Sequence, residues 1–287
     1  GWIPVFVIRF RNLLSFASTN PLGFLGLILV VLIIFCGLFG TALAPYDPFK
    51  IAVPDRLLPP SAEHLFGTDK LGRDVFSRVL AGSAYALQIG VFSVAISVCL
   101  GVVLGLVAGY GPRLLDNVLL LVFDATYSFP TVVLGLAFVT LFGASNVTLM
   151  GLVILFLTPA YARLIRTGTI SAKTADYVVA IRSLGASPVR ILALHILPNV
   201  VGPVLIVACM DVPGIIALEA GLTYLGFGVP PPAPSWGRIL EEGTGSIREA
   251  PWIVFAGGLP IVVATLGFTF FGEALRERFD PKRRRGR

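Results

Sequence analysis

The sequence has a low content of charged residues. Charged side chains make up 13% of its 287 residues, whereas a soluble protein typically carries about 25%. Hydrophobic residues reach 56%, which is too many for a disordered chain and argues against a soluble enzyme with one buried core. The shortage of charge therefore predicts a protein that crosses the membrane several times.

Cysteine and histidine are also rare. The three cysteines, Cys36, Cys99 and Cys209, all lie in apolar runs. Their odd number and their spacing fit neither a disulfide framework nor a metal-ligand set, so we interpret them as small packing residues. The two histidines, His64 and His195, are predicted on opposite sides of the membrane and cannot form one site. No metal site is predicted.

Motifs for nucleotide or hydrolytic chemistry are missing. A phosphate-binding loop needs a Gly-Lys pair that opens a helix, and no lysine of this sequence follows a glycine. The sequence contains neither a Gly-x-Ser-x-Gly elbow nor a His-Glu-x-x-His motif. We therefore expect a chain that is not an enzyme and holds no cofactor. Energy for uphill transport would come from a partner or from an ion gradient.

Long apolar runs are abundant. A membrane-spanning helix needs about 20 mostly apolar residues, and six segments reach that length. They are predicted at 22–43, 84–108, 115–141, 147–164, 200–222 and 252–274. The first is too long for a cleaved signal peptide and leads to Pro45-Tyr46-Asp47-Pro48 rather than to a cleavage site. The predicted fold is all-α, with six transmembrane helices.

The basic residues are distributed unevenly between the two sides of such a protein. Segments 1–20, 110–116, 162–195 and 272–287 lie on one side, with net charges of +2, 0, +4 and +4. Loops 44–83 and 223–251 lie on the other side, with net charges of 0 and −1. Because basic loops stay in the cytoplasm, both termini are predicted there. This bias explains the net charge of +6 without a nucleic-acid partner.

The chain divides into four predicted parts. The segment 1–21 is a cytoplasmic N-terminus, and 22–83 contains the first helix and an extracytoplasmic loop. A five-helix core at 84–275 includes a cytoplasmic loop at 166–199 and an extracytoplasmic loop at 223–251. The last part, 276–287, is a basic tail suited to lipid headgroups.

The cytoplasmic loop has the pattern of two helices joined by a tight corner. An apolar stripe at helical spacing is formed by Tyr177, Ala180, Ile181 and Leu184. Gly185 is suited to end the first helix, and Ser187-Pro188 to begin the second. Pro198 marks an end or a kink before the next span. Such a corner would either insert into a groove of another protein or lie on lipid headgroups.

This loop resembles the cytoplasmic Glu-Ala-Ala loop of permease subunits of binding-protein-dependent ABC importers. The resemblance rests on Ala180, Gly185 and the spacing to Leu197-Pro198-Asn199. In that family the loop docks into a cleft of the ATPase subunit and transmits its closure to the spans. Here Val179 stands at the glutamate position and Ile181 at the second alanine. The resemblance implies a coupling loop of Asp176, Tyr177, Ala180, Ile181, Arg182, Leu184, Gly185 and Ala186.

The loop 44–83 carries a more specific motif. Two glycines predict a turn and a flexible point, and an amphipathic helix beginning near Val75 then leads into the second span. The two aspartates lack the spacing of a calcium loop. The run 64–78 resembles the Leu-Gly-Thr-Asp-x-x-Gly-Arg-Asp-Val signature of the C-type permease of dipeptide, oligopeptide and nickel importers. The matching signature residues are Gly67, Thr68, Asp69, Gly72, Arg73 and Asp74.

A further match to the same family runs from Glu219 to Gly237. Its prolines at 230–232 force an extended path. Trp236 and Trp252 are each suited to a membrane–water boundary. The resemblance implies that this loop faces the outer gate and a docked binding protein, through Glu219, Leu225, Gly226, Gly228 and Trp236.

Asp124 and Asp211 lie within predicted spans, where a charge is costly and usually faces protein or water. One interpretation is that they line the translocation path and meet the amino terminus of a peptide. The other, which we favour, is that they are protonated or bonded to neighbouring spans.

The resemblance covers about residues 20–281 and implies one subunit of an ATP-driven importer in a bacterial-type plasma (inner) membrane. The implied partners are a homologous second permease subunit, an extracytoplasmic substrate-binding protein, membrane lipid and two ATPase subunits that hold ATP and Mg. The implied cargo is a di- or oligopeptide, with nickel or a small ligand such as glutathione as alternatives. A more distant alternative is an ion-coupled secondary transporter or channel that uses Asp124 and Asp211.

Overall fold

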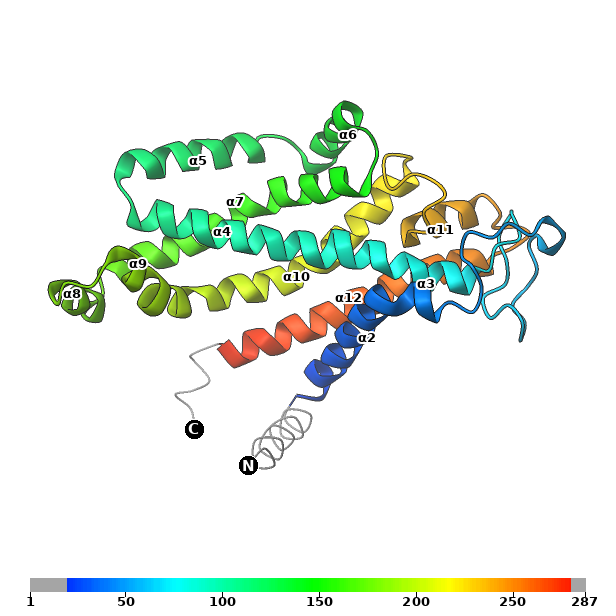
Figure 1. Ribbon diagram of the computed structural model, residues 1–287, viewed down its shortest axis with the longest axis horizontal. Coiled ribbons are helices and arrows are strands. Elements are labelled where there is room, and N and C mark those ends of the chain that lie inside the picture. Colours follow the sequence, from blue (N-terminus) through cyan, green and yellow to red (C-terminus); the bar gives the residue numbers. More distant parts are fainter. Residues whose placement is uncertain (1–19, 280–287) are drawn as a thin grey trace.

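The computed structural model describes residues 20–279, and this part of the chain consists of helices and loops (Figure 1). The predicted N-terminal segment up to residue 19 and the basic run 280–287 lie outside the described residues. The long helices of the described part are α2 (Pro21–Leu43), α4 (Ser93–Tyr110), α7 (Asn146–Lys173), α10 (Leu197–Tyr224) and α12 (Trp252–Phe279).

Shorter elements extend or connect these helices. The helix α3 (Val75–Ala86) continues through the π-helical turn η2 (Leu87–Phe92) into α4, so that one segment of 36 residues is formed. The helix α9 (Pro188–Ile191) continues through the π-helical turn η3 (Leu192–Ile196) into α10 in the same way. The remaining elements are η1 (Val53–Asp55), α5 (Arg113–Tyr127), α6 (Thr131–Phe142), α8 (Asp176–Ser183) and α11 (Trp236–Thr244).

Five of the six predicted spans are confirmed as helices that are long and apolar enough to cross a membrane. The third, predicted at 115–141, is wrong as a single helix, because α5 and α6 meet at an angle of 90°. The break falls at Pro130, which lacks an N–H group and disfavours a helical conformation of the residue before it. The pair counts as a sixth span only if both helices are taken together.

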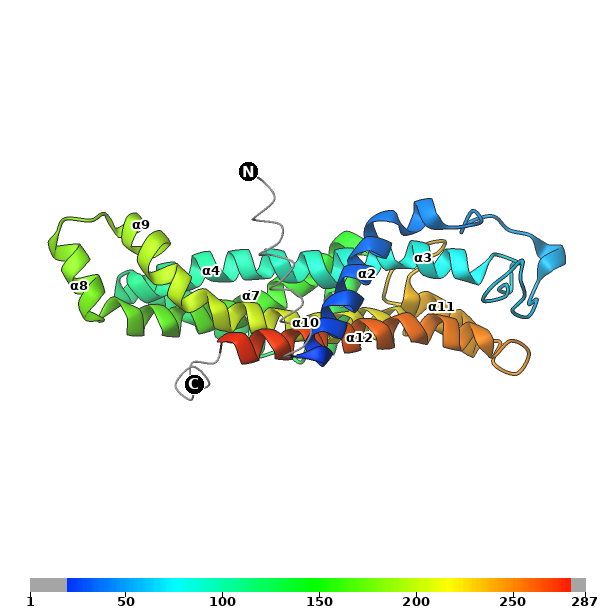
Figure 2. The ribbon, with the colours of Figure 1, turned by 90° about the horizontal axis from the view of Figure 1, so that it is seen from below.

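The long helices lie side by side in an elongated bundle, with small elements at its two ends (Figures 1 and 2). The helices α8 and α9 form one end. The loop 44–74, α3 and α11 form the other. The pair α5–α6 lies along one edge of the bundle, beside α4 and α7. Segments far apart in the sequence therefore meet at each end.

Among the described helices, α4 and α7 share the most extensive contact, and glycines allow their close approach. Gly101, Gly105 and Gly109 recur every fourth residue and share one face of α4. A Cβ atom on Gly105 would lie 2.7 Å from the Cβ atom of Ile165, closer than packed carbon atoms approach. Small residues at such spacing are the usual way in which membrane helices pack.

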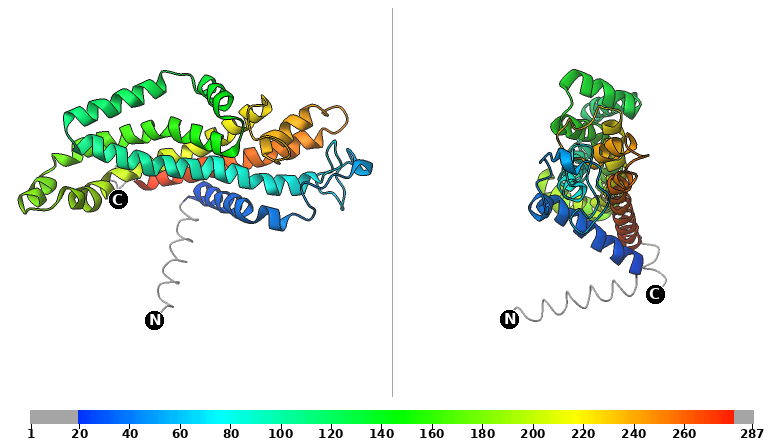
Figure 3. Two further views of the ribbon diagram at one scale, coloured as in Figure 1. Left: turned by 45° about the horizontal axis from the view of Figure 1, so that its top comes forward. Right: turned by 90° about the vertical axis from the view of Figure 1, so that its right-hand side faces the viewer.

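The first helix changes its partner along its length. Near its start, Gly23 and Gly26 contact α12; nearer its end Gly37 contacts Leu87 of η2, and Gly40 contacts α3. Figures 2 and 3 show α2 crossing α12 at an angle instead of running beside it. The helix therefore bridges two parts of the bundle.

We predict that Gly105→Leu destabilises the protein by about 1–3 kcal/mol, because the larger side chain overpacks the contact between α4 and α7. Thermal unfolding of the purified protein in detergent measures the change as a lower midpoint. Val103→Leu is the matched control, since Val103 is exposed on the other face of α4. Equal midpoints for the two variants would contradict the proposed packing.

Candidate functional site

The predicted corner at one end of the bundle is confirmed. The helix α8 ends before Gly185, which has a φ of +81°, a backbone conformation that favours glycine. The hydroxyl of Ser187 accepts a hydrogen bond from the backbone N–H of Arg190 and caps α9. We call the segment 176–191, which includes both helices, the elbow.

Two fully buried side chains, Val178 and Ile191, fix the elbow to the bundle. Val178 is absent from the predicted apolar stripe, so the stripe is only partly correct: Ile181 packs against the core, while Tyr177, Ala180 and Leu184 face outward. Leu184 is 86% exposed at the tip of the corner. The outward face of the elbow is therefore apolar at its tip.

Cationic side chains hold the base of the elbow against the end of α4. The guanidinium of Arg182 lies 5.7 Å from the ring centroid of Tyr110. The ammonium of Lys173 donates to the carbonyl of Gly109 over 3.2 Å. Of the other predicted coupling residues, Asp176 begins α8 and is exposed, and Ala186 is half-buried after the corner. The elbow thus rests on α4 while its tip is free in this chain.

The elbow leads directly into the longest helix of the described chain. Pro188–Tyr224 is one helical segment of 37 residues, which corresponds to about 55 Å at 1.5 Å per residue. Pro198 does not end the helix; it follows the π-helical turn η3, where the hydrogen-bonding pattern changes. The segment therefore connects the elbow with the opposite end of the bundle.

The signature of the loop 44–83 lies at that opposite end and is buried. Gly72 has a φ of +75° and approaches the carbonyl of Ala52 so closely that no side chain fits there. Asp74 caps α3 by accepting a hydrogen bond from the backbone N–H of Ser77 over 2.8 Å. The Nδ1 atom of His64 is 2.9 Å from the same aspartate.

Four charged side chains form a compact cluster beside this cap. Arg73 Nε is 2.7 Å from Asp69 Oδ2, and Arg78 Nη1 is 2.5 Å from the same oxygen. Both arginines also contact Glu242 of α11, at 3.2 Å and 2.5 Å. Arg78 is only 1% exposed. We call these four residues the charge cluster; its formal charges cancel, as burial requires.

The charge cluster joins the two large loops on that side of the protein. Asp69, Arg73 and Arg78 belong to the region of 44–83, whereas Glu242 belongs to 223–251. Sequence reasoning found Asp69 and Arg73 but missed Arg78 and Glu242. The available signal was the pair of basic residues in one loop and the adjacent acids Glu241-Glu242 in the other.

Two residues of the predicted outer-gate set, Glu219 and Trp236, are buried inside this chain. The Trp236 Nε1 atom donates to the carbonyl of Val79 over 3.0 Å. Glu219 accepts a hydrogen bond from Thr223 over 2.8 Å.

The other predicted residues of that loop lie near the surface or support it. Leu225 and Gly226 are exposed beyond the end of α10, and Gly226 has a φ of +84°. Gly228 is buried against Thr223, where a Cβ atom would clash. The exposed residues of the loop include the segment around Leu225, the prolines 230–232 and the segment 247–249.

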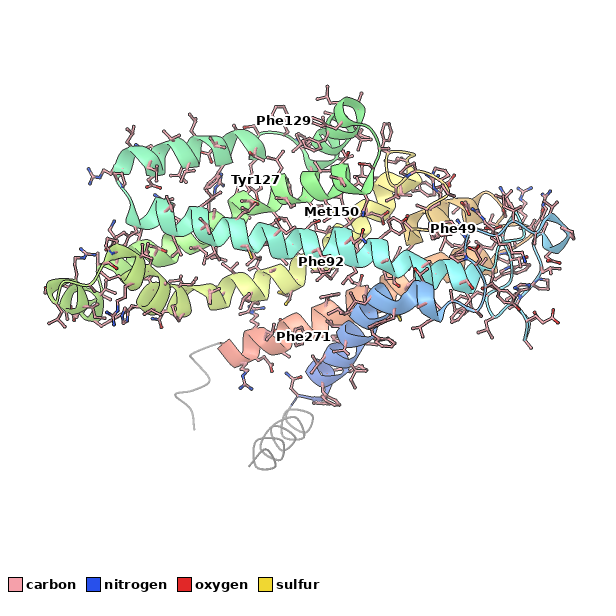
Figure 4. All side chains as sticks on the ribbon, in the orientation of Figure 1. Phe49, Phe92, Tyr127, Phe129, Met150 and Phe271 are labelled. Atoms are coloured by element: carbon pink, nitrogen blue, oxygen red, sulfur yellow. The ribbon has the colours of Figure 1, made fainter. Side chains whose placement is uncertain are left out.

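The intramembrane acids all have polar partners. Tyr161 donates to Asp211 over 2.8 Å, between α7 and α10. Arg163 donates to Asp124 over 2.6 Å, between α7 and α5, and its guanidinium lies 5.0 Å from the ring centroid of Tyr127. Figure 4 shows Tyr127 between these two helices. These contacts agree with the interpretation we favour, in which Asp124 and Asp211 are bonded to neighbouring spans.

The contact between Asp124 and Arg163 has a second property. The Asp124 side chain is 71% exposed in this chain, although Arg163 lies about 15 Å from the end of α7 at 1.5 Å per residue. A second ion pair, Arg166 with Asp116 at 2.5 Å, ties α5 to α7 nearer that end. Lipid tails do not tolerate an exposed charge pair, so this face needs protein or water.

The chain belongs to the family described as binding-protein-dependent transport system inner membrane component, which it matches over residues 101–285. Residues 18–60 match the N-terminal TM domain of oligopeptide transport permease C. The chain is therefore a multi-pass permease subunit.

Similar proteins are known from several bacteria. The chain is 35% identical to a dipeptide transport system permease of Alkalihalophilus pseudofirmus, over 96% of this chain and 91% of that protein. It is 36% identical to a di/tripeptide transport system permease of Pseudomonas aeruginosa, over 93% and 90%. It is also 36% identical to a glutathione transport system permease of Pectobacterium atrosepticum, over 88% and 84%.

We predict that Glu242→Gln lowers the free energy of unfolding by about 1–3 kcal/mol, because it leaves two buried arginines with one carboxylate. Thermal unfolding in detergent, followed by the loss of tryptophan fluorescence, measures the effect. Glu241→Gln is the control: it changes the adjacent acid of α11, a more exposed side chain that pairs with Arg238 of the same helix. The cluster would lose its structural role if both variants unfolded at the same temperature.

Proposed function

We propose that the chain is the permease subunit of an importer for di- or oligopeptides and is driven by separate ATPase subunits. The observation that carries the proposal is the family match over most of the chain, combined with an elbow whose apolar tip is exposed. Relatives named for dipeptide and di/tripeptide transport cover more of the chain than the relative named for glutathione transport. Peptide is therefore the proposed cargo, and glutathione and nickel remain alternatives.

The elbow is the proposed contact with the ATPase subunits. Exposed apolar side chains at a rigid corner are suited to a groove on another protein, and the buried anchors Val178 and Ile191 would carry its movement into the bundle. The continuous segment from α9 to α10 would pass that movement toward Leu225 at the far end. Two ATPase subunits would hold ATP and Mg; this chain would hold neither.

The face of α5 and α7 is the proposed side of the translocation path. The exposed pair of Asp124 and Arg163 supports this role, because it needs water or protein as its neighbour. A homologous second permease subunit on this face would complete the path and shield the pair from lipid. Asp211 lies on the neighbouring helix α10 and is bonded to Tyr161.

The proposed location is the bacterial inner membrane, with both termini in the cytoplasm. The support is the excess of basic residues in the segments on the side of the elbow. In this orientation the loops joined by the charge cluster face outward. They would present the segment around Leu225 to a substrate-binding protein that delivers the cargo.

We predict that Leu184→Asp reduces recovery of ATPase chains with the tagged permease by more than about tenfold, because a charge at the tip would lose a central apolar contact. Mass spectrometry after mild detergent extraction measures the recovery. Leu184→Met keeps the side chain apolar and serves as the control. Normal recovery and normal substrate-stimulated ATP hydrolysis in the Asp variant would show that the elbow does not couple the subunits.

We predict that Asp124→Asn lowers uptake of a labelled dipeptide by about tenfold, because Arg163 loses its counter-charge at membrane depth. Uptake is measured in proteoliposomes that contain the complete complex, with the binding protein and ATP. Ser128→Ala, at an exposed position of the same region, is the control. Unchanged uptake in Asp124→Asn and in Asp211→Asn would remove both residues from the pathway. Uptake of glutathione or Ni²⁺ in place of dipeptide would change the cargo and leave the permease role intact.

A further inference from the structure

An apolar groove lies where α2 passes from one partner helix to the next. Near its start α2 is in close contact with α12, and near its end with α3. Between these contacts the three helices leave a groove of about 190 Å³. Pro260 of α12 lines this groove and interrupts the hydrogen-bonding pattern of its helix there. The groove is therefore a consequence of the crossing of α2 over the bundle (Figures 2 and 3).

The lining offers no polar group to a ligand. It is formed mainly by Leu, Ile, Val, Phe and Pro side chains of α2, α3 and α12, with Phe66 and Trp236 contributed by the outer loops. Apart from the weakly polar thiol of Cys36, its two polar side-chain groups are already bonded within the chain. The hydroxyl of Ser83 donates to the carbonyl of Leu80, and the Nε1 atom of Trp236 to that of Val79. Water would find no hydrogen-bond partner in this space.

The groove opens between two membrane-spanning helices, onto an exposed apolar surface. Its two rims are Leu32 of α2, 48% exposed, and Leu259 of α12, 53% exposed. Both belong to membrane-spanning helices, and exposed apolar side chains such as Val31 and Phe255 continue the surface on either side. Val79 forms the buried floor. The depth along α2 places the groove in the half of the membrane nearer the loops 44–83 and 223–251.

From this geometry we propose that the groove binds one acyl chain of a phospholipid from the adjoining leaflet. An apolar protein cavity of about 150 Å³ stays dry and takes up hydrocarbon, and this groove is of that size and open to a hydrocarbon solvent. An inserted acyl chain gains dispersion contacts that the lining residues otherwise lack. It fills the space between α2, α3 and α12 and holds α2 in its crossed position. The site is independent of the cargo of the transporter.

The test uses the purified complex with its partner chains in nanodiscs of phosphatidylcholine that carries a diazirine on one acyl chain. After illumination, peptide mass spectrometry locates the adducts. We expect adducts on the buried floor, in the segment 79–83, as well as on the exposed Phe255. Cys36→Phe fills the groove and lowers the adducts on 79–83 by at least about fivefold, while those on Phe255 are unchanged. Val263→Phe, from α12, gives the same result from the opposite wall.

Cys99→Phe is the control, because it adds the same ring on the exposed surface of α4, outside the groove. This variant keeps the adducts on 79–83. Each variant must give a monodisperse complex with the unfolding temperature of the unchanged protein. If one of the two filling variants fails this requirement, the other is used in its place. Absence of adducts on 79–83, or adducts that neither filling variant reduces, would overturn the proposal. So would cross-links from 79–83 to a partner protein, which would identify the groove as a subunit contact.

Discussion

The helices of the bundle must associate in lipid, which does not drive apolar surfaces together as water does. Lipid tails are as apolar as leucine side chains, so membrane helices gain little by burying one apolar face against another. Close approach at small residues and a few polar bonds must supply the specificity instead. The contacts of Gly101, Gly105 and Gly109 with α7, and of Gly23 and Gly26 with α12, meet the first requirement. The helix α5 has no such glycine contact and is held to α7 by two ion pairs.

The two ends of the bundle differ in their charged and apolar contacts. At the end of the loops, charges are paired and buried, and the family signature forms a rigid support beneath the surface. At the elbow, the anchors Val178 and Ile191 are buried but the tip is apolar and exposed. One long helical segment connects these two ends.

Much of this was predictable from the sequence. Apolar length located five spans, and Gly185 with Ser187-Pro188 located the elbow, because these signals are local. Pro130 signals a kink in the third predicted span, but the run 115–141 stays apolar across it, so two helices at 90° were not predicted. Glu242 was missed as the partner of Arg78 because their contact joins residues 164 positions apart, and a single sequence holds no record of such pairing. The burial of Trp236 was not predicted, because it depends on α3 and not on its own segment.

The separation within the charge cluster has a consequence for biogenesis. The ribosome makes Asp69, Arg73 and Arg78 well before Glu242, and at about 5–20 residues per second the interval of 164 residues lasts about 8–33 s. During that time the two arginines share a single carboxylate within the cluster, that of Asp69. The arrival of α11 supplies the second carboxylate, that of Glu242. The cluster can therefore form only late in synthesis. Its formation requires that both loops have reached the same side of the membrane.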